Sequence, residues 1–185
     1  MSTQRHNLTD PELLEYSRKH VHYEIAMFFG LANILSQIPQ PDLGTPVTTR
    51  ISHHALLESF IVHLRNVLLF LYPYDSQTGD IISDDFFVDP IQEWKRKRPK
   101  EEVALRVARD RASKEVSHLT IHRRDDADPA KPWQFLELAK LVKAVFDEFV
   151  ENASSKKLDS KVTALVKSID LTTPVKFTDP SSGSI

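Results

Sequence analysis

Cysteine is absent from this chain of 185 residues, and glycine occurs only four times. The lack of cysteine excludes disulfides, a thiolate nucleophile and every Cys-ligated zinc or iron–sulfur site, and it suits a reducing compartment. The scarcity of glycine argues against a Gly-rich phosphate loop and against a fold of many tight β-turns. The sequence therefore disfavours nucleotide-binding loops and predicts a fold with few tight turns.

Long apolar runs are also missing. The most apolar stretch, residues 67–72, is far shorter than the roughly 20 apolar residues that a transmembrane helix needs. The first residues of the chain contain no apolar segment of the kind found in a secretory signal. We therefore expect a cytoplasmic protein without a membrane partner.

Enough apolar residues are present, at 41% of the chain, for one compact domain to fold alone. Eleven prolines punctuate the sequence, and apolar residues recur at three- and four-residue steps between them. This periodicity predicts an all-α antiparallel bundle of four to five helices, over residues 10–38, 49–72, 100–123 and 131–152, with a weaker helix over 158–169. We expect one domain over residues 1–170 and a mobile tail over 171–185.

Local patterns refine this prediction at three places. Thr9 and Glu12 have the spacing of a capping box at the start of the first helix. Apolar residues cover nearly the whole circumference of the helix over 49–72, which predicts a buried central helix. Segment 73–99 is expected to pack over the bundle as a lid, with two short helical turns that dock aromatic residues.

Basic residues outnumber acidic ones by eleven to five between residues 91 and 124. Such a surplus is usually a solvated helix surface, but it also suits an anionic partner. No cofactor is expected from any motif.

Polar residues interrupt the apolar helix over 49–72, and they are the main candidates for a binding site: Glu58, His63, Arg65 and Asn66. Buried polar groups need partners, and the helix over 100–123 offers Arg111, His118 and Arg123. We expect His63, Arg65, Asn66, Arg111 and His118 to form one cleft between these two helices. The alternative interpretation is a hydrogen-bond network that only fixes helix register.

The segment Arg111-Ala-Ser-Lys-Glu-Val-Ser-His118 resembles the HEPN superfamily of helical bundles, whose signature is an Arg followed at short distance by a His. The resemblance implies a metal-independent RNase or an RNA-binding protein of the defence or toxin type, acting as a homodimer. Arg111 would hold a phosphate and His118 would transfer a proton, while Glu58, His63, Arg65, Asn66 and Arg123 would complete the site. Residues 58–66 and 118–123 are also similar to bacterial helical proteins of unassigned activity.

Two other functions remain open at this point. The first is a non-catalytic interaction or scaffold bundle that binds another protein. The second is a metal-binding bundle of the DinB type, which the chain weakly resembles in length and helix number. Its ligands would come from His118, His122 and Glu115, completed by His53, His54 or His63, with His20 and Glu24 as a further pair.

Overall fold

The computed structural model describes residues 8–172 except 75, 90–92 and 118–131, and the side chains of residues 114–117 are also outside the description. The described residues form helices and contain no strand, which confirms the all-α prediction. The elements are α1 (Asp10–Tyr16), η1 (Ser17–Val21), α2 (His22–Gln37), α3 (Val47–Leu71), η2 (Ser83–Phe86), α4 (Trp94–Lys97), α5 (Val103–Ser117), α7 (Phe135–Asn152) and α8 (Ser160–Ser168).

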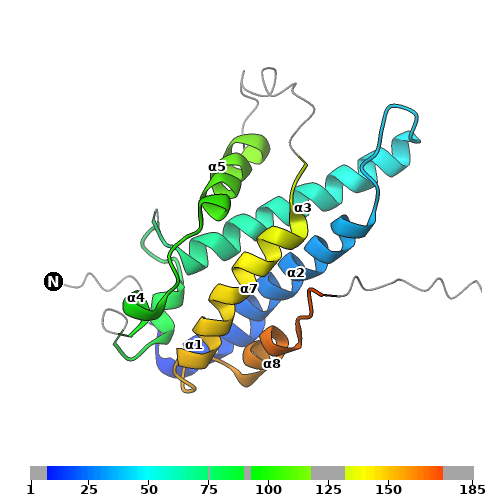
Figure 1. Ribbon diagram of the computed structural model, residues 1–185. Coiled ribbons are helices and arrows are strands. Elements are labelled where there is room, and N and C mark those ends of the chain that lie inside the picture. The colour runs from blue at the N-terminus through cyan, green and yellow to red at the C-terminus, as the bar shows by residue number, and fades with distance from the viewer. Residues whose placement is uncertain (1–7, 75, 90–92, 118–131, 173–185) are drawn as a thin grey trace, which may run out of the picture.

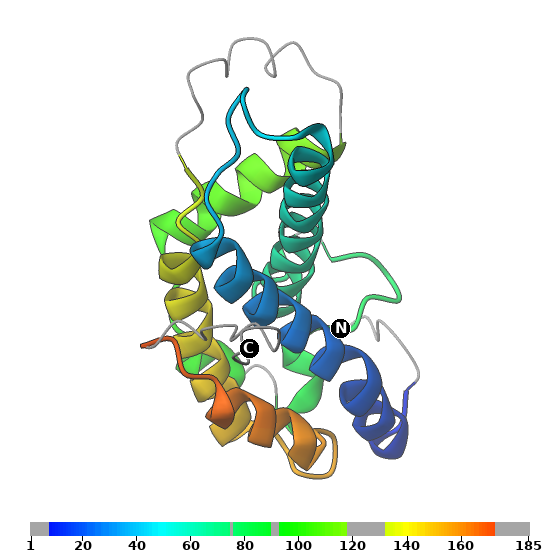
Figure 2. The same ribbon diagram turned by 90° about the vertical axis from the view of Figure 1, so that its right-hand side faces the viewer.

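A long hairpin of α2 and α3 is the frame of the bundle (Figure 1). α7 packs on α2, and α8 packs on both of them. Figure 2 shows α5 crossing near α3 and α7 at one end of the molecule, while α8 lies toward the other end. One continuous core fills the space between them, and its largest fully buried side chains include Phe28, Phe60, Leu64, Phe146 and Phe149.

The predicted first helix is present over residues 10–37, but it is not α-helical throughout. Glu12 accepts hydrogen bonds from the backbone N–H and the hydroxyl of Thr9, at 2.8 and 2.7 Å, so the predicted capping interaction is confirmed. Between α1 and α2, η1 is one turn of π-helix, in which His22 N–H bonds to Ser17 O five residues earlier. The Ser17 hydroxyl accepts from Asp159 N–H at 2.9 Å, which ties this turn to the start of α8.

Segment 73–99 packs on the bundle as predicted. Its aromatic residues Phe86, Phe87 and Trp94 are fully buried. The Trp94 Nε1–H donates to the Ser83 hydroxyl at 2.8 Å, so the indole is both packed and hydrogen-bonded. η2 and α4 are the two short helical turns that the sequence predicts here.

The prediction that α3 is buried on all sides is wrong. α2 and α5 cover two sides of α3, and the remaining side is exposed along Ile51, Glu58, Val62 and Arg65. Apolar content overstated burial here because several apolar side chains of α3 face solvent. By length and composition alone α3 could span a membrane, but core helices of soluble proteins pass the same test.

The apolar residues of α5 have two different environments: Leu105, Ala108 and Ala112 are buried, whereas Val103 and Val107 are exposed. The buried three recur at three- and four-residue steps, so they form one face of the helix. Val103 and Val107 lie on another face, which α3 and α7 do not cover.

The structure describes the first two residues of the expected tail, Leu171 and Thr172. Leu171 packs against the core, and Thr172 donates hydrogen bonds to the Asp170 carboxylate from its backbone N–H and its hydroxyl. The rest of the predicted tail, residues 173–185, lies outside the described residues.

Arg98 joins the lid to the end of α3. Its Nη1 donates to Leu71 O at 2.9 Å and to Asp84 Oδ1 at 3.1 Å. The guanidinium also lies over the Tyr72 ring at 5.7 Å and near the Trp94 ring at 6.0 Å. A cation at a helix C-terminus interacts favourably with the helix dipole, so Arg98 both ends α3 and holds η2 and α4 against it.

We expect Arg98→Ala to lower the free energy of unfolding by about 3 kcal/mol, because it removes one partner of a largely buried ion pair. Urea denaturation followed by circular dichroism measures the change. Arg106→Ala is the matched control, because Arg106 is exposed on α5, and we expect it to stay within about 0.5 kcal/mol of wild type. Equal effects of the two substitutions would contradict this account of Arg98.

The alkaline stability of the fold should depend on Tyr72. Burial, reinforced by the charge of Glu101, raises the pKa of Tyr72 to about 12. The unfolded chain ionises this phenol near pH 10, so the stabilising contribution is complete below pH 10 and is lost as the pH rises toward 12.

We therefore expect the melting temperature to fall less between pH 10 and 12 in Tyr72→Phe than in wild type. Burial also raises the pKa of Tyr16, but Tyr16 is present in both proteins and does not affect the comparison. Parallel falls in the two proteins would show that Tyr72 ionises as freely in the fold as in the unfolded chain.

Candidate functional site

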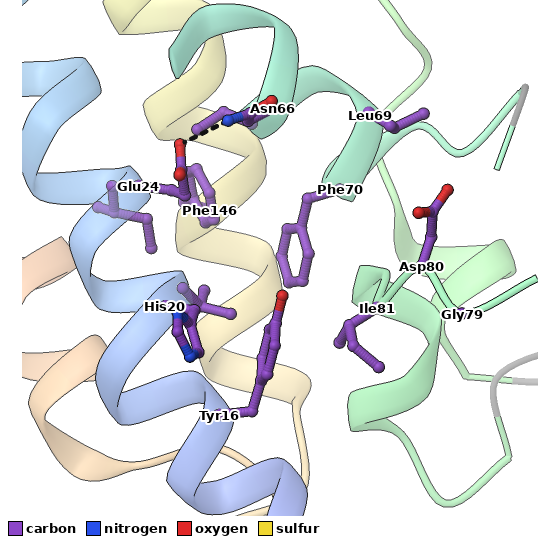
Figure 3. A pocket seen from close by; sticks show the side chains of 13 residues that line it. Tyr16, His20, Glu24, Asn66, Leu69, Phe70, Gly79, Asp80, Ile81 and Phe146 are labelled. Atoms are coloured by element: carbon purple, nitrogen blue, oxygen red, sulfur yellow. Dashed lines mark hydrogen bonds between the residues drawn. The ribbon is translucent and has the colours of Figure 1, made fainter. Parts of the chain in front are cut away.

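His63 and Asn66 find their partner on α2. The His63 Nδ1–H donates to Glu24 Oε2 at 2.7 Å, and the Asn66 amide donates to the same oxygen at 3.2 Å. Figure 3 shows Asn66 and Glu24 facing each other between α3 and α2. Their partner among the described residues is thus a carboxylate of the first long helix, while the expected partner His118 lies outside the described residues.

Helix geometry explains this pairing. His63 and Asn66 are three residues apart, so they occupy one side of α3, and this is the side that packs on α2. His63 is buried, and the Tyr23 ring meets it edge-on at 5.5 Å. Glu24 thus satisfies a buried imidazole that would otherwise lose a hydrogen bond.

Glu58 and Arg65 do not belong to a buried network. Both side chains are exposed on the open side of α3. Burial therefore does not force Glu58 and Arg65 to find partners. Either residue remains available to a partner at the surface.

Arg111 lies on α5 against the start of the segment that leads into α7. Its guanidinium carbon is 4.1 Å from the centroid of the Trp133 ring, which is a close cation–π arrangement. Trp133 in turn meets the Phe60 ring of α3 at 6.1 Å. Arg111 is thus held half-buried beside the core, while its expected partners His118 and Arg123 lie outside the described residues.

Among the residues that the structure describes, three buried side-chain nitrogens have no hydrogen-bond partner: Arg50 Nε, His53 Nδ1 and Trp133 Nε1. Arg50 and His53 lie on the same side of α3 as Phe60, which packs on Trp133. A buried polar group without a partner costs about 1–3 kcal/mol. Each of these nitrogens can present an N–H group, so each suits an acceptor that carries negative charge.

The pKa of His53 is lowered, first by burial and then by the neighbouring His54. The lowered pKa favours the neutral imidazole, whose Nδ1 either donates or accepts according to its tautomer. We refer below to Arg50, His53, Arg111 and Trp133 as the donor cluster.

Metal ligands do not assemble in the part of the chain that the structure describes. No group of three His, Asp or Glu side chains is found there with the geometry to hold a metal ion. Among the ligands of the DinB-type alternative, His118 and His122 lie outside the described residues, as does the side chain of Glu115.

Sequence reasoning did not find the donor cluster or the role of Glu24. Trp133 has the pattern of a core residue, and nothing in its spacing reveals that its indole nitrogen lacks a partner. Arg50 and His53 do carry a signal, because two cationic or imidazole side chains stand three residues apart at the start of an apolar helix. The sequence singles out Glu24 only as one member of a pair with His20, which lies one helical turn earlier.

A double-mutant cycle tests the interaction between Glu24 and His63. We expect their coupling energy in urea denaturation, from Glu24→Ala, His63→Ala and the double variant, to be about 1–3 kcal/mol, because the imidazole is buried. The control is the exposed pair Glu15–Lys19 on the same helical segment, at 2.7 Å, whose coupling should not exceed about 0.5 kcal/mol. Similar values in the two cycles would mean that Glu24 does not stabilise His63.

Comparisons of the chain with protein-family models, with curated proteins and with solved structures find no match. No relative therefore supplies a function for this fold. Three features of the chain bear on its function: the donor cluster, the interactions of Glu24, and the HEPN-like spacing of Arg111 and His118.

Proposed function

We propose that the protein is a cytoplasmic HEPN-like bundle that binds RNA through the donor cluster and cleaves it with the help of His118. The observation that carries this proposal is the set of buried, unpartnered nitrogens of Arg50, His53 and Trp133. Phosphate oxygens are strong acceptors, and a guanidinium can bind them bidentately. An RNA phosphate would satisfy the nitrogens of Arg50, His53 and Trp133, for which the described part of the chain offers no acceptor.

The charge of the neighbouring segment supports an anionic ligand. Exposed basic side chains precede and occupy α5, namely Lys95, Arg96, Lys100 and Arg106. Arg98 and Arg109 are instead engaged with Asp84 and Glu101, respectively. The free basic groups would attract a polyanion over a distance of about 10 Å, in a salt-dependent manner.

The proposed chemistry requires no metal ion. Arg111 would hold the phosphate and stabilise charge that develops on it during the reaction. His118, seven residues later in the sequence, would accept the proton of the 2′-hydroxyl or donate one to the leaving oxygen. Because HEPN proteins act as dimers, we further propose a homodimer in which both subunits contribute to cleavage.

RNA binding and cleavage can be measured separately with a fluorescent single-stranded RNA in EDTA. We expect Arg111→Ala to weaken binding at least about tenfold, since a hydrogen bond to a charged group contributes roughly 1.5–3 kcal/mol. His118→Ala should abolish cleavage while binding is retained. Lys161→Ala, an exposed basic position on α8, is the control and should change neither activity.

Light scattering of the same samples establishes whether the active species is a homodimer. Cleavage that survives in His118→Ala would contradict the catalytic assignment. Binding unaffected by Arg111→Ala would contradict the donor cluster as the RNA site.

A non-catalytic interaction protein is the second candidate function. It is favoured by the exposed apolar side chains of Val47, Ile51 and Val62 on the open side of α3. Apolar side chains gathered on one surface often mark a site of protein–protein contact. A folded wild-type protein that neither binds nor cleaves RNA would leave this candidate as the better description.

A further inference from the structure

A cavity of about 290 Å³ lies beside the end of α3, remote from Arg50 and His53 at its start. The charged side chains that line it are acidic, whereas the donor cluster consists of N–H donors. The cavity opens between the first long helix and the end of α3. Its lining residues are Tyr16, His20, Val21, Glu24, Ile25, Asn66, Val67, Leu69, Phe70, Gly79, Asp80, Ile81 and Phe146. In Figure 3, Tyr16 and His20 stand on one wall and Ile81 and Asp80 on the other, with Phe70 between them.

The π-helical turn η1 shapes the first wall. A π-turn contains one residue more than an α-turn, and such turns occur frequently at functional sites. Here it follows Tyr16 and places the rings of Tyr16 and His20 4.7 Å apart beside the cavity. The turn is held from behind by the Ser17–Asp159 hydrogen bond.

A tight turn shapes the second wall. Asp80 Oδ2 accepts from Gln77 N–H at 2.6 Å, and Asp80 N–H donates to Gln77 O at 3.1 Å. Gly79 has a φ of 100°, which side chains other than hydrogen rarely allow. Glycine at this position thus lets the chain present Asp80 and Ile81 to the cavity.

The described residues of the lining carry negative charge and include no lysine or arginine. Its two carboxylates are Glu24 and Asp80. Glu24 accepts hydrogen bonds from His63 and Asn66. Among the described residues, no ammonium or guanidinium group pairs with its carboxylate. Both carboxylates also raise the pKa of Tyr16, after the larger effect of burial, so their fields reach the phenol.

Aromatic rings provide the apolar part of the lining, from Tyr16, Phe70 and Phe146. Aromatic faces attract cations, most strongly where water is excluded. The combination suits binding of a cation with an apolar body.

We propose that this cavity binds a small organic ammonium ion, which the negative charges of Glu24 and Asp80 on opposite walls attract, with its apolar body against Tyr16 and Phe70. The volume is at the lower end of ligand pockets, which are typically about 300–1,000 Å³. The occupant is therefore a small amine rather than a nucleotide or a peptide. This site is independent of the proposed RNA site.

Three isosteric probes test the charge preference by calorimetry: 2-phenylethylamine, 2-phenylethanol and phenylacetate. We expect the amine to bind at least about tenfold more tightly than the alcohol, and phenylacetate not to bind, because like charges repel. Equal binding of the amine and the alcohol would overturn the proposal. So would preferential binding of phenylacetate, or no binding of the amine at millimolar concentration.

Variants locate the binding. Asp80→Asn and Glu24→Gln preserve size and should each weaken amine binding about fivefold or more, whereas Asp110→Asn on α5, an exposed carboxylate, should not change it. Because Glu24→Gln also alters the contacts to His63, Ile81→Trp serves as a second test that fills the cavity without changing charge. Amine binding that persists in folded Ile81→Trp and Asp80→Asn would place the ligand elsewhere and contradict the proposal.

Discussion

The guanidinium of Arg98 is the contact on which the arrangement of the helices depends most. It meets the last carbonyl of α3, the carboxylate of Asp84 and two aromatic rings at one point. The next residue, Pro99, accepts a hydrogen bond from the Tyr72 hydroxyl at 3.2 Å, so the chain enters α5 from a fixed position. The position of Arg111, which stacks on Trp133, therefore depends on an interaction at the end of the lid.

The sequence predicted the helices because periodicity and proline report local preferences. Pro46 and Pro73 bracket α3, Pro132 precedes α7, and apolar steps identify the inner face of α7. The π-turn at Ser17–Val21 was not predictable in this way, because an inserted residue leaves no proline or glycine behind it. It is stabilised by a contact with Asp159, which is more than 100 residues away in the sequence.

The candidate site was only partly predictable for a related reason. That a buried polar residue needs a partner is confirmed for His63, which bonds to Glu24, whereas Asn66 is exposed and its bond to Glu24 is not forced by burial. Which partner they meet depends on whether α2 or α5 covers that side of α3, and a single sequence does not specify how helices pack around one another. Trp133 illustrates the limit further, because its ring behaves as core while its nitrogen lacks an acceptor.

The single additional residue in η1 ties the cavity to the register of the N-terminal helix. In an α-helix each residue advances the chain by about 100° around the axis. Loss of one residue from Ser17–Val21 would restore α-helical register and swing Leu13 and Tyr16 by roughly that angle relative to α2, taking the phenol off the cavity wall and disturbing the buried contacts of Leu13. A deletion that removes the cavity must therefore also rearrange the packing of the N-terminal helix, so the two features change together in evolution.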